Sequence, residues 1–78
     1  MAKHRLEISR PAERQLRKLS RDDQRRVVKG ILALATDPRR KGTRRLTGYD
    51  DVFRIRIGPH RILYSVSGKR LVLILVKA

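Results

Sequence analysis

Residues 53–64 read FRIRIGPHRILY, in which apolar and basic side chains alternate on both sides of Gly58-Pro59. Such an alternation is typical of a strand with one buried face and one exposed face. A tight turn at Gly58-Pro59 would fold the stretch into an antiparallel hairpin. The expected register then pairs Ile57 with His60, Arg56 with Arg61, and Arg54 with Leu63.

Three arginines, Arg54, Arg56 and Arg61, share one face of this predicted hairpin. The guanidinium group stays charged at any physiological pH, and no carboxylate lies in the same register. Such a face is suited to an anionic ligand. Protection of the sheet against aggregation is the alternative explanation, but one face of two adjacent strands is a costly place for it. The opposite face is apolar, as expected of the half of a sheet that faces a core.

The charge of the whole chain points the same way. Lysine and arginine number 21 against 7 aspartates and glutamates, which gives a net charge of +14 on 78 residues. A charge of this size repels itself, and it is explained if the protein is normally bound to phosphate or to an acidic protein. The length predicts a single domain over residues 1–78, whose stability is marginal without a partner.

The sequence argues against a metal centre, a disulfide framework and a membrane span. It has no cysteine, and its two histidines, His4 and His60, are far apart in the chain. Its longest apolar run, residues 71–76, is too short to cross a bilayer, and its first residues lack the hydrophobic stretch of a signal peptide. We therefore expect a cytoplasmic protein that needs neither a metal ion nor an organic cofactor.

Two helices are expected between a strand at residues 3–9 and a basic connection at residues 39–51. Ser9 and Ser20 are suited to cap the two helix N-termini, and acidic residues follow in each first turn. Apolar residues at helical spacing give each helix one buried stripe, and a proline ends the second helix. Gly30, inside the second helix, costs about 1 kcal/mol relative to alanine and is explained by close packing against the first helix.

A second hairpin is predicted to turn at Gly68-Lys69. Its core register is expected to pair Val66 with Leu71, Tyr64 with Leu73, and Ile62 with Leu75. The same register places Leu63, Val72, Ile74 and Val76 beside the arginines, so a partner should cover this amphipathic face. Strand 71–76 is apolar throughout and is predicted to lie inside the sheet. The expected fold is α+β with the order βααβββ, a two-helix hairpin packed on one face of a small antiparallel sheet.

The run at residues 53–64, the Leu46-Thr47-Gly48 segment before it and the basic helical hairpin resemble the RelE/ParE superfamily of toxins from type II toxin–antitoxin systems. The resemblance covers essentially the whole chain. It implies a RelE-like fold and silencing by an antitoxin that wraps the toxin in a complex. RelE-type members enter the ribosomal A site and cleave mRNA, whereas ParE-type members bind DNA gyrase and poison it.

By this resemblance, the catalytic basic positions of RelE-type members fall on Arg54, Arg56 and Arg61. Attack of a 2′-hydroxyl on its own phosphate develops negative charge, which fixed guanidinium groups stabilise. We expect Arg56 and Arg61 to contact the scissile phosphate and Arg54 to contact a neighbouring phosphate or rRNA. His60 is expected to be structural, because the register turns it towards the helices.

Other residues are predicted to contact RNA or an acidic antitoxin. The RNA-binding residues are expected on the helices and the basic connection: Arg14, Arg17, Lys18, Arg25, Arg44, Arg45 and Tyr49. For the helical residues a solvated surface is the alternative, and for Tyr49 it is a cover for the sheet edge. The antitoxin is expected to cover Leu63, Val72 and Ile74 with apolar side chains.

One departure from the RelE-type pattern leaves other functions open. RelE-type members usually continue past the last strand with another arginine and an acid/base residue, whereas this sequence stops at Val76-Lys77-Ala78. The chain is interpreted as a metal-independent endoribonuclease that acts on ribosome-bound mRNA and inhibits translation. The alternatives are a ParE-type gyrase inhibitor and a truncated member that binds RNA or its antitoxin without cleaving.

Overall fold

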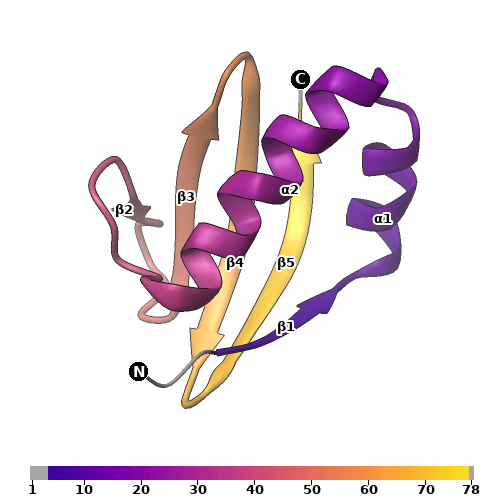
Figure 1. Cartoon of the computed structure of the whole chain (residues 1–78). Helices are drawn as coiled ribbons and strands as arrows, with labels where there is room; N and C mark the ends of the chain where they lie inside the picture. Colours follow the sequence, from indigo (N-terminus) through magenta and orange to yellow (C-terminus); the bar gives the residue numbers. More distant parts are fainter. Residues whose placement is uncertain (1–3, 78) are drawn as a thin grey trace.

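The computed structural model describes residues 4–77, which form two helices and five strands (Figure 1). In chain order these are β1 (Arg5–Ile8), α1 (Arg10–Arg17), α2 (Arg21–Thr36), β2 (Arg44–Arg45), β3 (Val52–Ile57), β4 (His60–Ser67) and β5 (Arg70–Lys77). Apart from β2, this is the predicted order of elements. Neither of the two described helices has the length and apolar character needed to cross a membrane.

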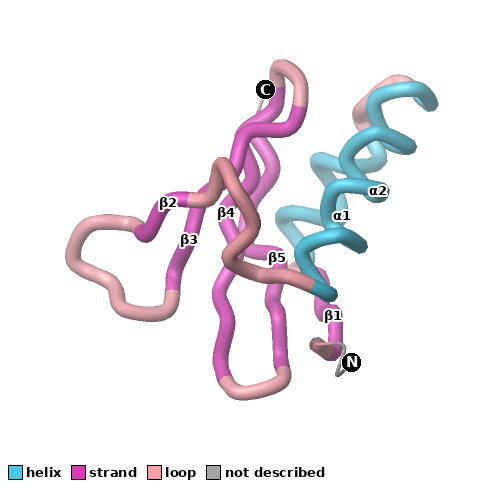
Figure 2. Tube along the Cα trace, turned by 60° about the vertical axis from the view of Figure 1, so that its left-hand side comes forward, coloured by secondary structure: helices cyan, strands magenta, loops and turns pink. Residues whose placement is uncertain are grey.

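All five strands belong to one sheet, in the order β1-β5-β4-β3-β2. Both helices lie on the same side of this sheet, and no helix of residues 4–77 covers the other side (Figure 2). The predicted α+β fold, with a helical hairpin on one sheet face, is therefore confirmed. The sheet is mixed rather than wholly antiparallel, because β1 runs parallel to β5. Strand β5 lies between β1 and β4, which confirms that the most apolar strand is internal.

Both predicted helix caps are present. The Ser9 hydroxyl accepts from the Ala12 N–H at 3.2 Å, and the Ser20 hydroxyl accepts from the Asp23 N–H at 3.2 Å. Each bond satisfies one of the free donors at a helix N-terminus. The Ser9 hydroxyl also donates to the Ile74 carbonyl at 2.6 Å, so the cap of α1 fastens this helix to β5.

The first hairpin has the predicted register. Ile57 pairs with His60, Arg56 with Arg61, and Arg54 with Leu63. Gly58 adopts a φ of 58°, a conformation that favours glycine, at the first position of the turn. The three arginines are exposed on one face, and the other face turns Phe53 and Ile55 into the core.

The second hairpin departs from the predicted register in its last part. Val66 pairs with Leu71 and Tyr64 with Leu73 as expected, but a bulge follows and Ile62 pairs with Val76 instead of Leu75. The extra residue in β5 reverses the expected sides of the last residues. Val76 is buried in the core with 2% exposure, whereas it was predicted to lie beside the arginines. Leu75 pairs with Leu63, on the arginine side.

Two further expectations were wrong. The connection at residues 39–51 contains β2, which pairs with the beginning of β3 through Arg44–Arg54 and Arg45–Phe53. Gly30 does not pack against α1. A Cβ atom at Gly30 would overlap Cδ1 of Ile57, so the glycine lets α2 approach β3 closely.

The core fills the space between the helices and the sheet. Phe53 and Tyr64 form a stacked aromatic pair, with ring centroids 5.7 Å apart. The Tyr64 hydroxyl donates to the Pro38 carbonyl, and burial raises the pKa of this phenol. The remaining buried side chains come from both helices and from the three long strands: Ala12, Val27, Ile31, Leu34, Ile55, Ile62, Leu71, Leu73 and Val76.

Candidate nucleic-acid interface

The arginine side of the sheet forms one basic cluster. Arg54 and Arg56 lie on β3, and Arg61 pairs with Arg56 from β4. Strand β2 adds Arg44, which pairs with Arg54 and therefore lies on the same face. The structure thus brings together all three predicted catalytic residues and one predicted RNA-binding residue.

These arginines surround a depression of about 370 Å³, which we call the arginine depression. Its lining consists of Gly42, Arg44, Arg54, Ile55, Arg56 and Arg61. Ile55 lies between Arg54 and Arg56 on β3, and its side chain is 9% exposed because it turns into the core on the other face. Gly42, at a φ of 97°, comes from the loop before β2 and closes the depression on that side.

No carboxylate of the described chain neutralises this cluster. The ion pairs within residues 4–77 lie elsewhere, between Arg17 and Glu13 and between Arg70 and Glu7, and Asp23 lies beside His60. Like charges that face each other across two strands are destabilising on their own. An anionic ligand would therefore stabilise the cluster, since guanidinium groups can bind phosphate oxygens in pairs.

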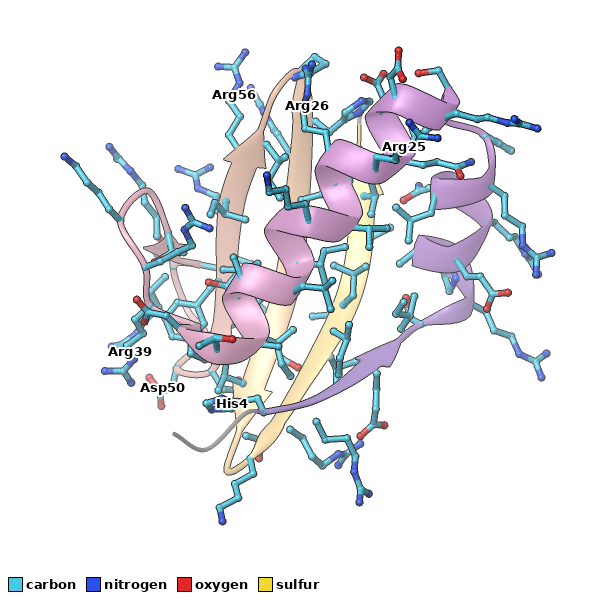
Figure 3. The ribbon with its side chains drawn as sticks, viewed as in Figure 1. His4, Arg25, Arg26, Arg39, Asp50 and Arg56 are labelled. Carbon is cyan, nitrogen blue, oxygen red and sulfur yellow. The ribbon has the colours of Figure 1, made fainter. Side chains whose placement is uncertain are left out.

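Arg56 is also held by the backbone. Its Nε donates to the Gly58 carbonyl at 3.3 Å, which directs the side chain along the β3–β4 turn. In Figure 3 Arg56 extends from β3 beside this turn, and Arg26 approaches the same turn from α2. A guanidinium group positioned in this way is partly preorganised for a ligand.

The other predicted RNA-binding residues do not join the cluster. Arg14, Arg17 and Lys18 are exposed at α1 and Arg25 on α2, in the helical layer on the other side of the sheet. Arg45 lies with its guanidinium 5.9 Å from the centre of the Phe53 ring. Tyr49 is 57% exposed in the loop between β2 and β3. RNA binding by these six residues stays a prediction.

The residues predicted to bind an antitoxin are half-buried. Leu63 pairs with Arg54, and Val72 pairs with Ser65, so both lie on the sheet face away from the helices. Ile74 lies at the bulge of β5. Leu75, which the predicted register had assigned to the core side, pairs with Leu63 on this face. Antitoxin binding by these residues stays a prediction.

His60 lies on the helical side, as its register predicted. Its side chain is almost fully buried, and Nε2 is 3.3 Å from Asp23 Oδ2 without the geometry of a hydrogen bond. Among residues 4–77, no three histidine, aspartate or glutamate side chains come together as metal ligands would.

Gly42 is the lining residue that sequence reasoning missed. It belongs to the run RRKGTRR at residues 39–45, in which basic residues flank one glycine. A glycine inside a basic run indicates a loop whose backbone can approach a phosphate closely. Residues 39–45 therefore carry a sequence signal for a phosphate-binding loop as well as for a connection.

Comparison with known families gives one match over almost the whole chain. A family model described as the ParE toxin of the type II toxin–antitoxin system, parDE, matches residues 6–77. No curated protein sequence matches the chain significantly.

Solved structures resemble the fold closely. The RelE–RelB complex of the archaeon Pyrococcus horikoshii OT3 aligns with a TM-score of 0.84 and 26% identity, over 99% of this chain and 94% of that one. The toxin–antitoxin complex RelBE2 of Mycobacterium tuberculosis aligns with a TM-score of 0.83 and 23% identity, over 96% of both chains. The intact RelBE complex of E. coli gives a TM-score of 0.81 and 22% identity, over 95% of this chain and 94% of that one.

Proposed function

Because the chain belongs to the ParE toxin family of type II toxin–antitoxin systems, we propose that it is a RelE-type toxin that cleaves ribosome-bound mRNA. The observation that carries this proposal is the arginine depression, where four guanidinium groups meet without a carboxylate. Ribosomes and mRNA would place its action in the cytoplasm. Neither a metal ion nor an organic cofactor is required by this chemistry.

The proposed reaction is an attack of a ribose 2′-hydroxyl on the adjacent phosphate. The new bond closes a 2′,3′-cyclic phosphate, and the 5′-oxygen of the next nucleotide leaves with a proton. Negative charge grows on the phosphoryl oxygens during this step, and fixed donors stabilise it more strongly than mobile water does. Arg56 and Arg61, paired across β3 and β4, are assigned to those oxygens, and Arg54 to a neighbouring phosphate.

The arginines do not supply the proton transfers. A guanidinium pKa above 12 leaves almost no free base at neutral pH, so an arginine is a poor general base. The proposal therefore assigns Arg54, Arg56 and Arg61 to charge stabilisation alone.

We also propose that an acidic antitoxin binds the sheet face that lacks helices. The related structures from Pyrococcus horikoshii and E. coli are complexes of RelE with RelB. On this chain the half-buried Leu63, Val72 and Leu75 offer apolar contacts next to the arginines. Ile74, at the bulge, remains part of the proposed contact. A partner with apolar and acidic side chains would match both halves of this face.

A ParE-type gyrase inhibitor is the second candidate, because the matching family model carries the ParE name. This class binds an enzyme and has no need for an arginine cluster directed at a scissile phosphate. The two candidates therefore differ in what the cluster contributes, and a direct test can separate them.

The test compares wild type with Arg56→Ala and Arg61→Ala in primer extension on translating mRNA. Each substitution should reduce cleavage about a hundredfold or more, because one preorganised donor is worth that much to a transition state. Lys69→Ala, at the exposed β4–β5 turn, removes a charge far from the cluster and should leave cleavage unchanged.

The same preparations go into a DNA gyrase supercoiling assay. Wild type that blocks gyrase without cleaving mRNA would establish the ParE-type function. Cleavage that survives both arginine substitutions would refute the assignment of the cluster. Inactivity in both assays would contradict both candidates and favour a binding role.

A further inference from the structure

A second depression adjoins the arginine depression on the other side of β3. It has a volume of about 400 Å³ and lies between α2, the loop at residues 40–42 and the end of β3. We call it the α2 depression. Its lining consists of Arg26, Lys29, Gly30, Ala33, Arg40, Lys41, Gly42, Ile55, Arg56 and Ile57. The two depressions share Gly42, Ile55 and Arg56, so they are continuous around the edge of the sheet.

The fold creates this hollow through a short strand and a small side chain on α2. Strand β2 pairs only with Phe53 and Arg54, so residues 55–57 of β3 have no partner strand on that edge within the described chain. Ala33 places little side-chain volume on the facing side of α2, and Ile57 packs directly against Gly30 beside it. The result is an apolar floor, formed with Ile55 and Ile57, that the core does not fill.

The rim of the α2 depression is strongly basic. Arg26 and Lys29 come from α2, Arg40 and Lys41 from the loop, and Arg56 from β3. No carboxylate belongs to the lining, and none of these five residues takes part in an ion pair within residues 4–77. The guanidinium of Arg26 lies next to Gly58, whose carbonyl accepts from Arg56 Nε. The two arginines thus converge at the β3–β4 turn (Figure 3).

We propose that the α2 depression is a nucleotide subsite, which holds the nucleotide next to the one whose phosphate occupies the arginine depression. The proposal rests on the proposed function, because that function places the first phosphate. The base lies on the floor of Gly30, Ala33 and Ile57, and the rim cations bind its phosphate. A single-stranded nucleic acid suits this pattern, since such sites combine a cationic groove with planes on which bases stack, and the guanidinium groups of Arg26, Arg40 and Arg56 are such planes.

Continuity favours a nucleic acid strand over an acidic peptide. Arg56 lines both depressions, so one ligand with a charge in each must pass that residue. A nucleic acid strand carries one phosphate per nucleotide, and each nucleotide also carries a base. This repeat matches two cationic depressions that share Arg56. An acidic peptide needs no apolar floor of this shape between its charges.

The test measures binding of oligodeoxynucleotides by calorimetry, with 5′-phosphorylated probes of one to four nucleotides. These probes lack the attacking 2′-hydroxyl and stay intact. For wild type, affinity should increase when a second nucleotide is added. Ala33→Leu fills the floor without changing charge, and Lys29→Gln removes one rim cation. Each should lower affinity for the longer probes about tenfold, the loss expected for one base contact, and leave the mononucleotide unaffected.

Lys69→Gln is the matched control, because it removes the same charge at an exposed turn distant from both depressions. It should retain the gain from the second nucleotide. Equal gains in wild type, Ala33→Leu and Lys29→Gln would overturn the proposal. A second outcome would also overturn it: Ala33→Leu and Lys29→Gln lose affinity for a tetraglutamate peptide but keep the gain in affinity from the second nucleotide. The α2 depression would then be a surface for an acidic protein.

Primer extension on the same proteins separates this proposal from the proposed function. Absence of mRNA cleavage by wild type contradicts the proposed function. The increase of oligodeoxynucleotide affinity with probe length is measured by calorimetry and does not depend on cleavage. Normal cleavage without any length dependence contradicts the subsite alone.

Discussion

At the scale of single residues, Phe53 and Arg54 are neighbours on β3 that lie on opposite faces of the sheet. Phe53 is buried and stacks on Tyr64, its partner on β4. Arg54 is exposed and pairs with Leu63. The alternation of side chains along a strand fixes these two sides.

The alternation predicts stability effects of very different size for two neighbouring substitutions. Phe53→Ala should lower the free energy of unfolding by about 3 kcal/mol or more, since it empties a buried site stacked on Tyr64. Arg54→Ala, one residue further and exposed, should change it by at most about 0.5 kcal/mol. Urea denaturation measures both values. Similar losses for the two variants would contradict the assigned faces of β3.

At the scale of elements, the helices and both hairpins were predictable because their signals are local. Serine caps, apolar stripes and turn glycines act within a few residues. Strand β2 was not predictable, since two residues show no alternation and form a strand only through pairing with β3. The bulge in β5 was missed for a related reason, because its strand is apolar on both sides of Leu73 and gives no sign of a register shift.

The residues of the candidate site also divide into those predictable from local sequence signals and those placed by contacts distant in the chain. The arginines of β3 and β4 were brought together by a hairpin whose register the sequence specifies. Arg44 and Gly42 joined them through β2 and its preceding loop, which depend on contacts distant in the chain. The α2 depression combines three segments and could not be anticipated from any one of them.

An element-scale prediction concerns the attachment of β1. Glu7 on β1 accepts two bonds from Arg70 on β5, at 2.6 and 3.0 Å, and the hydrogen bond with this guanidinium lowers the pKa of Glu7. A lowered pKa means that the ion pair stabilises the fold above the unfolded pKa of about 4.3 and that this contribution is lost as the pH falls through the folded value.

Thermal melts between pH 6 and pH 3 should therefore show a smaller decrease in Tm for Glu7→Gln than for wild type. The effect is small because both side chains are exposed. Arg70→Gln removes the partner and should reduce the acid sensitivity in the same way. An equal decrease in all three proteins would exclude a stabilising role for this pair.

At the scale of the whole molecule, part of the net charge of +14 is concentrated in the two adjoining depressions. The protein concentrates unneutralised cations around the edge of β3, where a polyanion can neutralise several of them at once. Counterions released from that polyanion then dominate the salt dependence of binding.

Affinity for ribosomes or single-stranded RNA should consequently decrease steeply with salt, with a logarithmic slope of about 0.7 for each neutralised phosphate of a single strand. Arg54→Gln should reduce this slope by about one phosphate contact, and Lys69→Gln should not change it. Titrations from low to physiological salt provide the slopes. A salt-independent affinity would be incompatible with an interface built on phosphate.

The position of β5 also determines when the domain can fold during its synthesis. This strand supplies Leu71, Leu73 and Val76 to the core and pairs with both β1 and β4, yet it is translated after every other described element. Contacts between its residues and those of β1 join positions about as far apart as this chain allows, and such contacts form late. A nascent chain that still lacks β5 has no partner for β1 and an incomplete core. The domain therefore matures only once β5 has left the ribosome that made it.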